Sequence, residues 1–503
     1  MHTRRILINA IMSISQVIVI SIVLFFLYRF LLKTIGIEKL GIWSLILATT
    51  SVTQIANMGL SGSVVKFVAK YSAKGEPDNA SKVIQTATLS IAISIGIILL
   101  ALYPALKLIL GLIIVPESLS LACEILPFSL FALWILTIAN IFNAGLDGCQ
   151  RIYIRNVLLM VGFLLYFFLA LVLTPRYGLI GLAYAQVAQN SFIFFCSWFF
   201  IKRFIASLPV IPYQWDRNTF KEIICYGIHF NMISITIMLC DPITKALLSK
   251  FSSLSMVGYY EMANKMVLQF RSLLLSVNQV LVPEIANLQE RLPEKIKSVY
   301  IASYRLFFYL SVPLFSLLIV STPAISDLWI GGVKQYFVIF ATLLLIGRFF
   351  NTLEGPAYFV NLGSGRIAWN VISHLIKTGL NLGLGAFLGL LFGGTGVVVG
   401  WVMSLIIGSC IIFFSYHIKN KISLMELLPK ASRLILIMCL VIVTASFLIQ
   451  NGLNQLYNLS LLNYIIIIFF SIIIFILLWL HPMRRCLIGW INNDLLNNKK
   501  VKA

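Results

Sequence analysis

Five basic residues lie inside segments that are otherwise apolar enough to cross a membrane. All fall in the second half of the chain, and they are Lys245, Lys265, Arg271, Arg348 and Lys377. A cation in the hydrocarbon core of a bilayer costs roughly 3 kcal/mol or more, so it normally faces a water-filled cavity or a charged partner. Arg binds phosphate oxygens in bidentate fashion and Lys acts as a point charge. These residues therefore indicate a path through the membrane for an anionic group.

Two of these cations follow an acidic residue at the spacing of one helical turn. Asp241 precedes Lys245 by four residues. Glu261 precedes Lys265 by the same spacing, and residues four apart share one face of a helix. Two interpretations stay open: the pairs help their spans to dock, or Asp241 and Glu261 couple transport to an ion. Both lysines lie in the outer part of the membrane and belong to the predicted anion-binding set.

The other three cations, Arg271, Arg348 and Lys377, have no acidic residue within one turn of their own helix. Glu354 follows Arg348 by six residues, about two-thirds of a turn away around the helix, and is a third candidate for ion coupling. Pairing across helices stays open for all three cations. Since they fall near the middle of their predicted spans, we expect them to form a cationic cavity that attracts an anionic headgroup.

Amide side chains on several spans are candidates for contacts with sugars. In membrane helices, Asn and Gln more often form hydrogen bonds between packed helices, so we expect most of them to be structural. The candidate sugar contacts are Asn57, Asn140, Asn264 and Asn278.

The composition is that of a membrane protein with many spans. Of the 503 residues, 60% are hydrophobic and 11% are charged, whereas a soluble domain carries about 25% charged residues. The net charge of +21 does not indicate nucleic-acid binding, because the basic residues recur in short loops between apolar segments. The eight cysteines are scattered without metal-ligand spacing. There is no GxxxxGK[ST] phosphate loop and no large loop for catalytic groups, so we expect neither a cofactor nor an enzyme.

Segments of about 20 apolar residues mark transmembrane helices. The sequence predicts fourteen of them, at about 6–30, 41–65, 83–108, 119–146, 153–174, 179–201, 222–248, 256–284, 300–325, 336–360, 368–391, 394–418, 433–450 and 462–481.

The distribution of Lys and Arg predicts the orientation of these spans. If the N-terminus is cytoplasmic, 26 of the 38 basic residues fall in cytoplasmic segments, seven fall outside and five lie within spans. Positive residues are enriched on the cytoplasmic side of membrane proteins. We therefore expect both termini to be cytoplasmic and the number of spans to be even.

Short motifs recur at a nearly constant spacing along the chain. The matched stretches are Cys149–Ile152 with Ser364–Ile367 and Tyr177–Gly178 with Phe392–Gly393, both at a sequence offset of 215, and Gly41–Trp43 with Gly258–Tyr260, at an offset of 217. This offset equals six spans, so both halves start on the same side of the membrane. It predicts an all-α protein of two six-helix lobes, related by a parallel repeat, plus two extra C-terminal helices.

The repeat divides the chain into three predicted parts: an N-terminal lobe at 1–218, a C-terminal lobe at 219–420, and spans 13 and 14 with a basic cytoplasmic tail at 421–503. In transporters built from such repeats, the substrate site lies between the halves near the midplane. Rocking of the halves then gives alternating access.

With this organisation the chain resembles the polysaccharide transporters, or O-antigen-type oligosaccharide flippases, of the multidrug/oligosaccharidyl-lipid/polysaccharide exporter superfamily. The stretches that carry the resemblance are Gly36–Trp43 with Asn57–Leu60, Tyr177–Tyr184 and Val257–Lys265. The resemblance implies a flippase that moves an undecaprenyl diphosphate-linked oligosaccharide from the cytoplasmic to the outer leaflet of the bacterial plasma membrane. Its product would serve the biosynthesis of O-antigen, capsule or exopolysaccharide.

Members of the same superfamily leave two alternatives, a cation-coupled multidrug antiporter and a lipid II flippase. The first is disfavoured because the spans of the first lobe hold no clearly buried acid that would bind a cationic drug. An enzyme of polysaccharide assembly is the alternative from another class. As partners we expect the lipid-linked oligosaccharide, membrane lipids, and a polysaccharide polymerase or glycosyltransferases, with no nucleic acid and a functional monomer.

Overall fold

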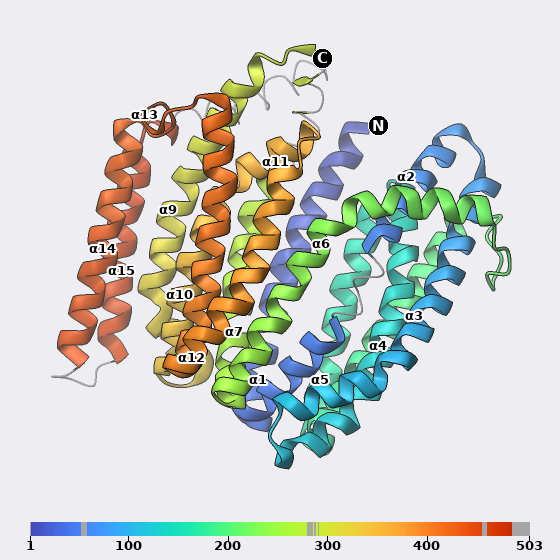
Figure 1. Ribbon diagram of the computed structural model, residues 1–503, viewed down its shortest axis with the longest axis horizontal. Helices are drawn as coiled ribbons and strands as arrows, with labels where there is room; N and C mark the ends of the chain where they lie inside the picture. The colour runs from blue at the N-terminus through green and yellow to red at the C-terminus, as the bar shows by residue number, and fades with distance from the viewer. Residues whose placement is uncertain are drawn as a thin grey trace. The chain divides into compact units, whose positions relative to one another are not determined.

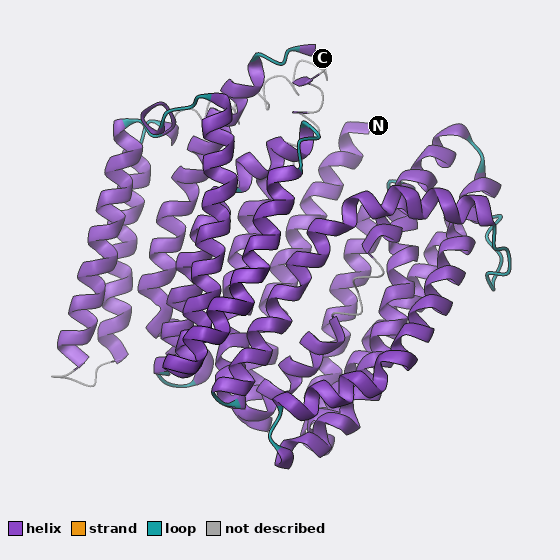
Figure 2. Ribbon diagram, in the orientation of Figure 1, coloured by secondary structure: helices purple, strands orange, loops and turns teal. Residues whose placement is uncertain are grey.

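The protein is helical throughout the part of the chain that the computed structural model describes, with no strand in that part (Figure 2). The described residues are 2–51, 58–278, 285, 288–289, 291–454 and 460–484. Among them, eight helices are long and apolar enough to cross a membrane, and Tyr464–Leu480 is a shorter apolar helix. The all-helical membrane architecture is therefore confirmed, whereas the count of fourteen spans and the side of the termini stay predictions.

The described structure divides into two compact units. The first unit comprises Met1–Met262 and Thr378–Gly400. Its helices are α1 (His2–Ser51), α2 (Met58–Lys74), α3 (Pro77–Ile113), α4 (Pro116–Gly148), α5 (Ile152–Phe204) and α6 (Arg217–Phe251) (Figure 1). It also holds the start of α7 (Leu254–Asn278) and the middle of α12 (Ala368–Asn420). The lobe boundary near residue 218 stays a prediction from the repeat.

The second unit comprises Ala263–Lys377 and Trp401–Ala503. Its helices are α9 (Lys295–Ile330), α10 (Gln335–Leu353), α11 (Gly355–Gly363), α13 (Leu424–Leu427), α14 (Lys430–Asn454) and α15 (Ser460–Leu480), with parts of α7 and α12.

Helix α9 organises the core of the second unit. Its Tyr300, Tyr304, Phe308 and Val312 are spaced four residues apart, so they form one stripe that packs in the same cluster as Tyr416 of α12. Further along α9, a second cluster joins this helix to α14 and α15. The two C-terminal apolar helices are thus part of the second unit.

Single glycines interrupt the longest helices. A straight 53-residue helix such as α5 would measure about 80 Å, far more than the ~30 Å hydrocarbon core. Gly178 breaks α5 with φ 59° and ψ −135°, which glycine adopts without the steric cost that a side chain would bring. A Cβ placed on Gly181 would lie 2.3 Å from the carbonyl oxygen of Leu173, eight residues earlier, so the chain reverses there. The predicted boundary between spans 153–174 and 179–201 is therefore confirmed.

Local backbone geometry recurs at the sequence offset of the predicted internal repeat. Gly393 breaks α12 with φ 61° and ψ −145°, nearly the angles of Gly178, its counterpart at the sequence offset of 215. A Cβ on Gly396 would lie 2.0 Å from the carbonyl of Leu388, which matches Gly181 and Leu173 at the same offset. Shifted by this offset, helix α5 also coincides with α12 to within one residue.

Candidate functional site

Lys377 and Glu354 form a buried ion pair in the second unit. The Lys377 ammonium lies 2.7 Å from Oε1 and 2.8 Å from Oε2 of Glu354. Only 2% of Lys377 and 4% of Glu354 is exposed. The Asn351 amide donates a further hydrogen bond of 2.7 Å to Glu354. The sequence left open whether Lys377 pairs with a residue on another helix, and the structure shows that it pairs with Glu354.

Two local features of the sequence place this pair. Glu354 lies where α10 ends and α11 begins, just before Pro356, which has no N–H to continue the helix. On α12, a Cβ placed on Gly408 would lie only 2.2 Å from Cγ of Lys377 and 2.6 Å from its Cε. Lys377 therefore lies in the space that Gly408 leaves by having no side chain.

Arg271 and Arg348 add two positive charges beside the pair. Both are partly exposed, in contrast to Lys377. The guanidinium of Arg348 lies 5.5 Å from the centre of the Trp401 ring, a cation–π contact. Arg271 is within electrostatic range of both Arg348 and Glu354, and its Nε has no hydrogen-bond partner among the described residues.

We call Arg271, Arg348, Lys377 and Glu354 the basic cluster. Three cations and one carboxylate give it a net charge of +2. Because Lys377 and Glu354 offset each other, the excess charge belongs to the two arginines. Like charges repel strongly away from bulk water, so the cluster favours an anion. Planar guanidinium groups match the oxygens of phosphate.

An acidic cluster lies in the first unit, where Lys245 bridges two carboxylates. Its ammonium lies 2.6 Å from Asp241 and 2.8 Å from Glu261, so the predicted contact between Asp241 and Lys245 is present. Glu261 is 2% exposed and also accepts hydrogen bonds from Tyr28 at 2.8 Å and Ser44 at 3.0 Å. By contrast, 40% of the Asp241 side chain is exposed. Asp241 is thus the more exposed of the two carboxylates.

The repeat explains which residues meet at Glu261. Ser44 and Glu261 are related by the sequence offset of 217, and so are Tyr28 and Lys245. Glu261 therefore accepts a hydrogen bond from Ser44, its own counterpart in the other half. Its two other donors, Tyr28 and Lys245, occupy positions that are equivalent to each other. Sequence analysis missed Tyr28 and Ser44, although the offset of 217 was the signal that identifies them.

Two glycines allow α1 and α7 to approach closely enough for these contacts. A Cβ on Gly41 would lie 1.9 Å from the carbonyl oxygen of Leu254, and one on Gly258 would lie 2.4 Å from that of Ile37. These two contacts are equivalent under the same offset of 217. Any side chain at either glycine would push the backbones apart.

The other predicted site residues are spread over the chain. Lys265 is partly exposed and Asn264 is buried, both on α7 in the second unit, and Asn140 is partly exposed on α4 in the first. Asn278 ends α7, but its side chain lies outside the described ones, and Asn57 lies outside the described residues. The sugar contacts predicted for the four asparagines stay predictions, and so does the anion binding predicted for Lys265.

Comparison with known proteins adds the family to this picture. Residues 26–339 match the family described as polysaccharide biosynthesis protein. No curated protein matches the chain. The apolar helices of the described structure define a multi-pass membrane protein. Since the match spans more than half of the chain, the protein belongs to the polysaccharide biosynthesis protein family.

Solved structures show the same fold at low sequence identity. A lipid II flippase, MurJ, in an inward closed conformation has a TM-score of 0.72 and 14% identity over 93% of this chain and 98% of its own. A multidrug resistance MATE transporter of the MOP superfamily, in an inward-facing conformation, has a TM-score of 0.69 and 16% identity over 82% of this chain and 99% of its own. A MOP superfamily transporter from Pyrococcus furiosus, described as having a binding pocket of reverse polarity, has a TM-score of 0.58 and 15% identity over 82% of this chain and 95% of its own.

The buried ion pair predicts the stability of charge-removing variants. Glu354→Gln leaves the Lys377 ammonium buried without its counter-charge, and we expect it to lower the free energy of unfolding by about 3 to 5 kcal/mol. Adding Lys377→Met removes the stranded charge and should restore most of that loss. Thermal unfolding of the purified protein in detergent measures both. A double variant as unstable as the single one would contradict this account.

The space at Gly408 predicts that two Gly→Ala variants of α12 differ in unfolding temperature. Gly408→Ala places a methyl group against the Lys377 side chain, so we expect a lower unfolding temperature. Gly379→Ala, on the same helix with open space around its Cβ, is the matched control and should not destabilise the protein. Equal unfolding temperatures for the two variants would show that Lys377 does not need this space.

Proposed function

We propose that the protein is a flippase for an isoprenoid diphosphate-linked oligosaccharide. In this proposal it moves the lipid from the cytoplasmic to the outer leaflet of a bacterial plasma membrane, for the assembly of a surface polysaccharide. The observation that carries the proposal is the basic cluster, whose two partly exposed arginines exceed the charge of its single carboxylate. The family match supports polysaccharide as the end product.

In the proposed mechanism, Arg271 and Arg348 hold the diphosphate by charge-assisted hydrogen bonds. The pair of Lys377 with Glu354 keeps the neighbouring helices in place and adds little net charge. The isoprenoid chain stays in the lipid while the headgroup passes through the protein. Alternation between two conformations then exposes the headgroup to one side of the membrane at a time.

The two alternatives within the superfamily predict other chemistry or another product. A carrier of cationic drugs would need excess negative charge where the substrate binds, and the basic cluster carries the opposite sign. A lipid II flippase would use the same diphosphate chemistry, and the likeness in fold to MurJ fits either substrate. The glycan and the end product therefore separate lipid II from a polysaccharide precursor.

Removal of the arginines tests the proposal in cells. We expect Arg271→Gln and Arg348→Gln each to lower surface polysaccharide about tenfold or more, because each removes charged hydrogen bonds to the diphosphate. Arg271→Lys, which keeps the charge but not the bidentate geometry, should retain part of the activity. Lys107→Gln, at an exposed position of α3, is the control for loss of one positive charge.

The assay needs matched amounts of each variant in the membrane, measured by immunoblot. Full export by both arginine variants would refute the assignment of the basic cluster. Normal polysaccharide together with loss of peptidoglycan synthesis in the variants would favour lipid II as the substrate. Efflux of an organic cation that depends on Asp241 would favour the drug antiporter.

The acidic cluster is the candidate for energy coupling. Asp241 is the more exposed of its two carboxylates, and it contacts Lys245. We expect a proton gradient to accelerate flipping by the wild-type protein in proteoliposomes and to have no effect on Asp241→Asn, because the amide cannot bind and release a proton. A sodium gradient at constant pH is the parallel arm. Flipping by the wild type that ignores both gradients would dismiss ion coupling at this site.

A further inference from the structure

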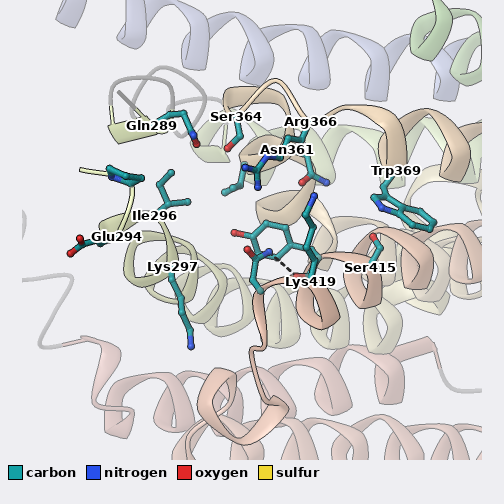
Figure 3. Close-up of a pocket in the computed structure, with 14 residues that line it drawn as sticks. Gln289, Glu294, Ile296, Lys297, Asn361, Ser364, Arg366, Trp369, Ser415 and Lys419 are labelled. Atoms are coloured by element: carbon teal, nitrogen blue, oxygen red, sulfur yellow. Dashed lines mark hydrogen bonds between the residues drawn. The ribbon is translucent and has the colours of Figure 1, made fainter. Parts of the chain in front are cut away.

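A cavity of about 350 Å³ lies in the second unit, apart from the basic cluster (Figure 3). Its lining comes from the start of α9, from the turn between α11 and α12, and from the last turn of α12. The Lys and Arg distribution assigns this end of the unit to the cytoplasmic side. Ligand sites in proteins range from about 300 to 1,000 Å³, so the cavity is large enough for a small headgroup.

Two cations and a hydroxyl in this cavity lack a hydrogen-bond or ion-pair partner among the described residues. They are the side chains of Arg366, Lys419 and Ser364. Lys297 also lines the cavity but lies 3.2 Å from Glu426. Glu294, the one acid of the lining, is exposed and points away from Arg366 and Lys419 in Figure 3.

The turn that carries Arg366 is built to the same plan as a turn in the first unit. Gly365 has φ 68°, and the Arg366 N–H donates to the carbonyl of Asn361 at 2.9 Å. Its counterpart at the sequence offset of 215, Arg151, follows a residue with φ 59° and donates to the carbonyl of Leu146 at 2.8 Å. The repeat thus puts one arginine at the same corner of each half.

The two corners differ in what the arginine contacts. In the first unit, the guanidinium of Arg151 lies 4.7 Å from the ring centre of Phe204, a cation–π contact, and donates to the Tyr153 hydroxyl at 3.5 Å. The position equivalent to Phe204, at the same offset of 215, is Lys419. In the second unit, therefore, the aromatic partner of the arginine is replaced by a second cation. Arg366 and Lys419 are both exposed, and they present two positive charges to the same cavity, which favours an anion there.

We propose that this cavity binds a phosphate-bearing anion, held between Arg366 and Lys419 with the Ser364 hydroxyl as a further donor. A guanidinium, an ammonium and a hydroxyl are the groups that bind phosphate oxygens in proteins. The phosphate belongs either to the headgroup of an acidic phospholipid or to a soluble compound. Trp369 at the rim is 44% exposed, and exposed Trp is enriched where a membrane meets water.

Binding to the purified full-length protein in a neutral detergent tests the proposal without measuring translocation. The lipid arm uses fluorescent short-chain phosphatidylglycerol, with the zwitterionic phosphatidylcholine analogue, whose net charge is zero, as its reference. The soluble arm uses inorganic phosphate and pyrophosphate as competitors of the fluorescent lipid. Saturable binding that phosphate does not displace identifies a phospholipid, and displacement by millimolar phosphate identifies a soluble ligand; both results support the site.

Three variants assign the binding to this cavity rather than to the basic cluster. Arg366→Gln removes one cation, and Lys419→Phe rebuilds the arginine–aromatic corner of the first unit. Each is expected to weaken binding about tenfold or more. Arg203→Gln, an exposed residue in the last turn of α5, removes the same charge elsewhere and should change binding less than about twofold.

Unfolding temperatures measure whether each variant is folded. If Arg366→Gln does not fold, Lys419→Phe, which keeps the arginine and places an aromatic residue at the matched position, still tests the site. Absence of saturable binding in either arm would overturn the proposal. So would binding that Arg366→Gln and Lys419→Phe reduce no more than Arg203→Gln does.

Discussion

The contact between Lys377 and Glu354 is the constraint around which the second unit is arranged. Removing two charges from water is costly, and only close geometry with further hydrogen bonds offsets that cost. Pro356 interrupts the helix beside Glu354, and Gly408 leaves the space that Lys377 fills. Because this pair neutralises itself, the net charge of the basic cluster rests on the two arginines. The buried ion pair therefore has a structural role, whereas the two arginines are the groups suited to hold a substrate.

The two halves of the internal repeat share local backbone geometry but carry different side chains at matched positions. In the first unit it brings Ser44 against its own counterpart Glu261, where two equivalent donors, Tyr28 and Lys245, converge. At the turns that precede α5 and α12, the matched arginine lies against an aromatic ring in one half and lines a cavity together with a lysine in the other. Matched positions of the two halves therefore share the turns and glycines that shape the fold, while their side chains differ.

Sequence alone predicted the features that leave strong local signals. Cations inside apolar segments are rare because they are costly, and Gly178 and Gly393 mark reversals that other residues disfavour. The contact of Asp241 with Lys245 followed from helical spacing. The partner of Lys377 and the donors to Glu261 did not, because contacts across helices depend on how the helices pack. The offset of 217 would have suggested Tyr28 and Ser44 only once the axis of the repeat was located.

The central claim is that the positive charge of the basic cluster recognises a lipid diphosphate. It is tested most directly with purified protein in proteoliposomes, by comparing translocation of one oligosaccharide on two lipid carriers. One carrier joins the glycan to the isoprenoid through a diphosphate, and the other joins it through an uncharged linker. The account predicts rapid translocation of the diphosphate form and little of the uncharged form. Equal rates for the two would contradict it.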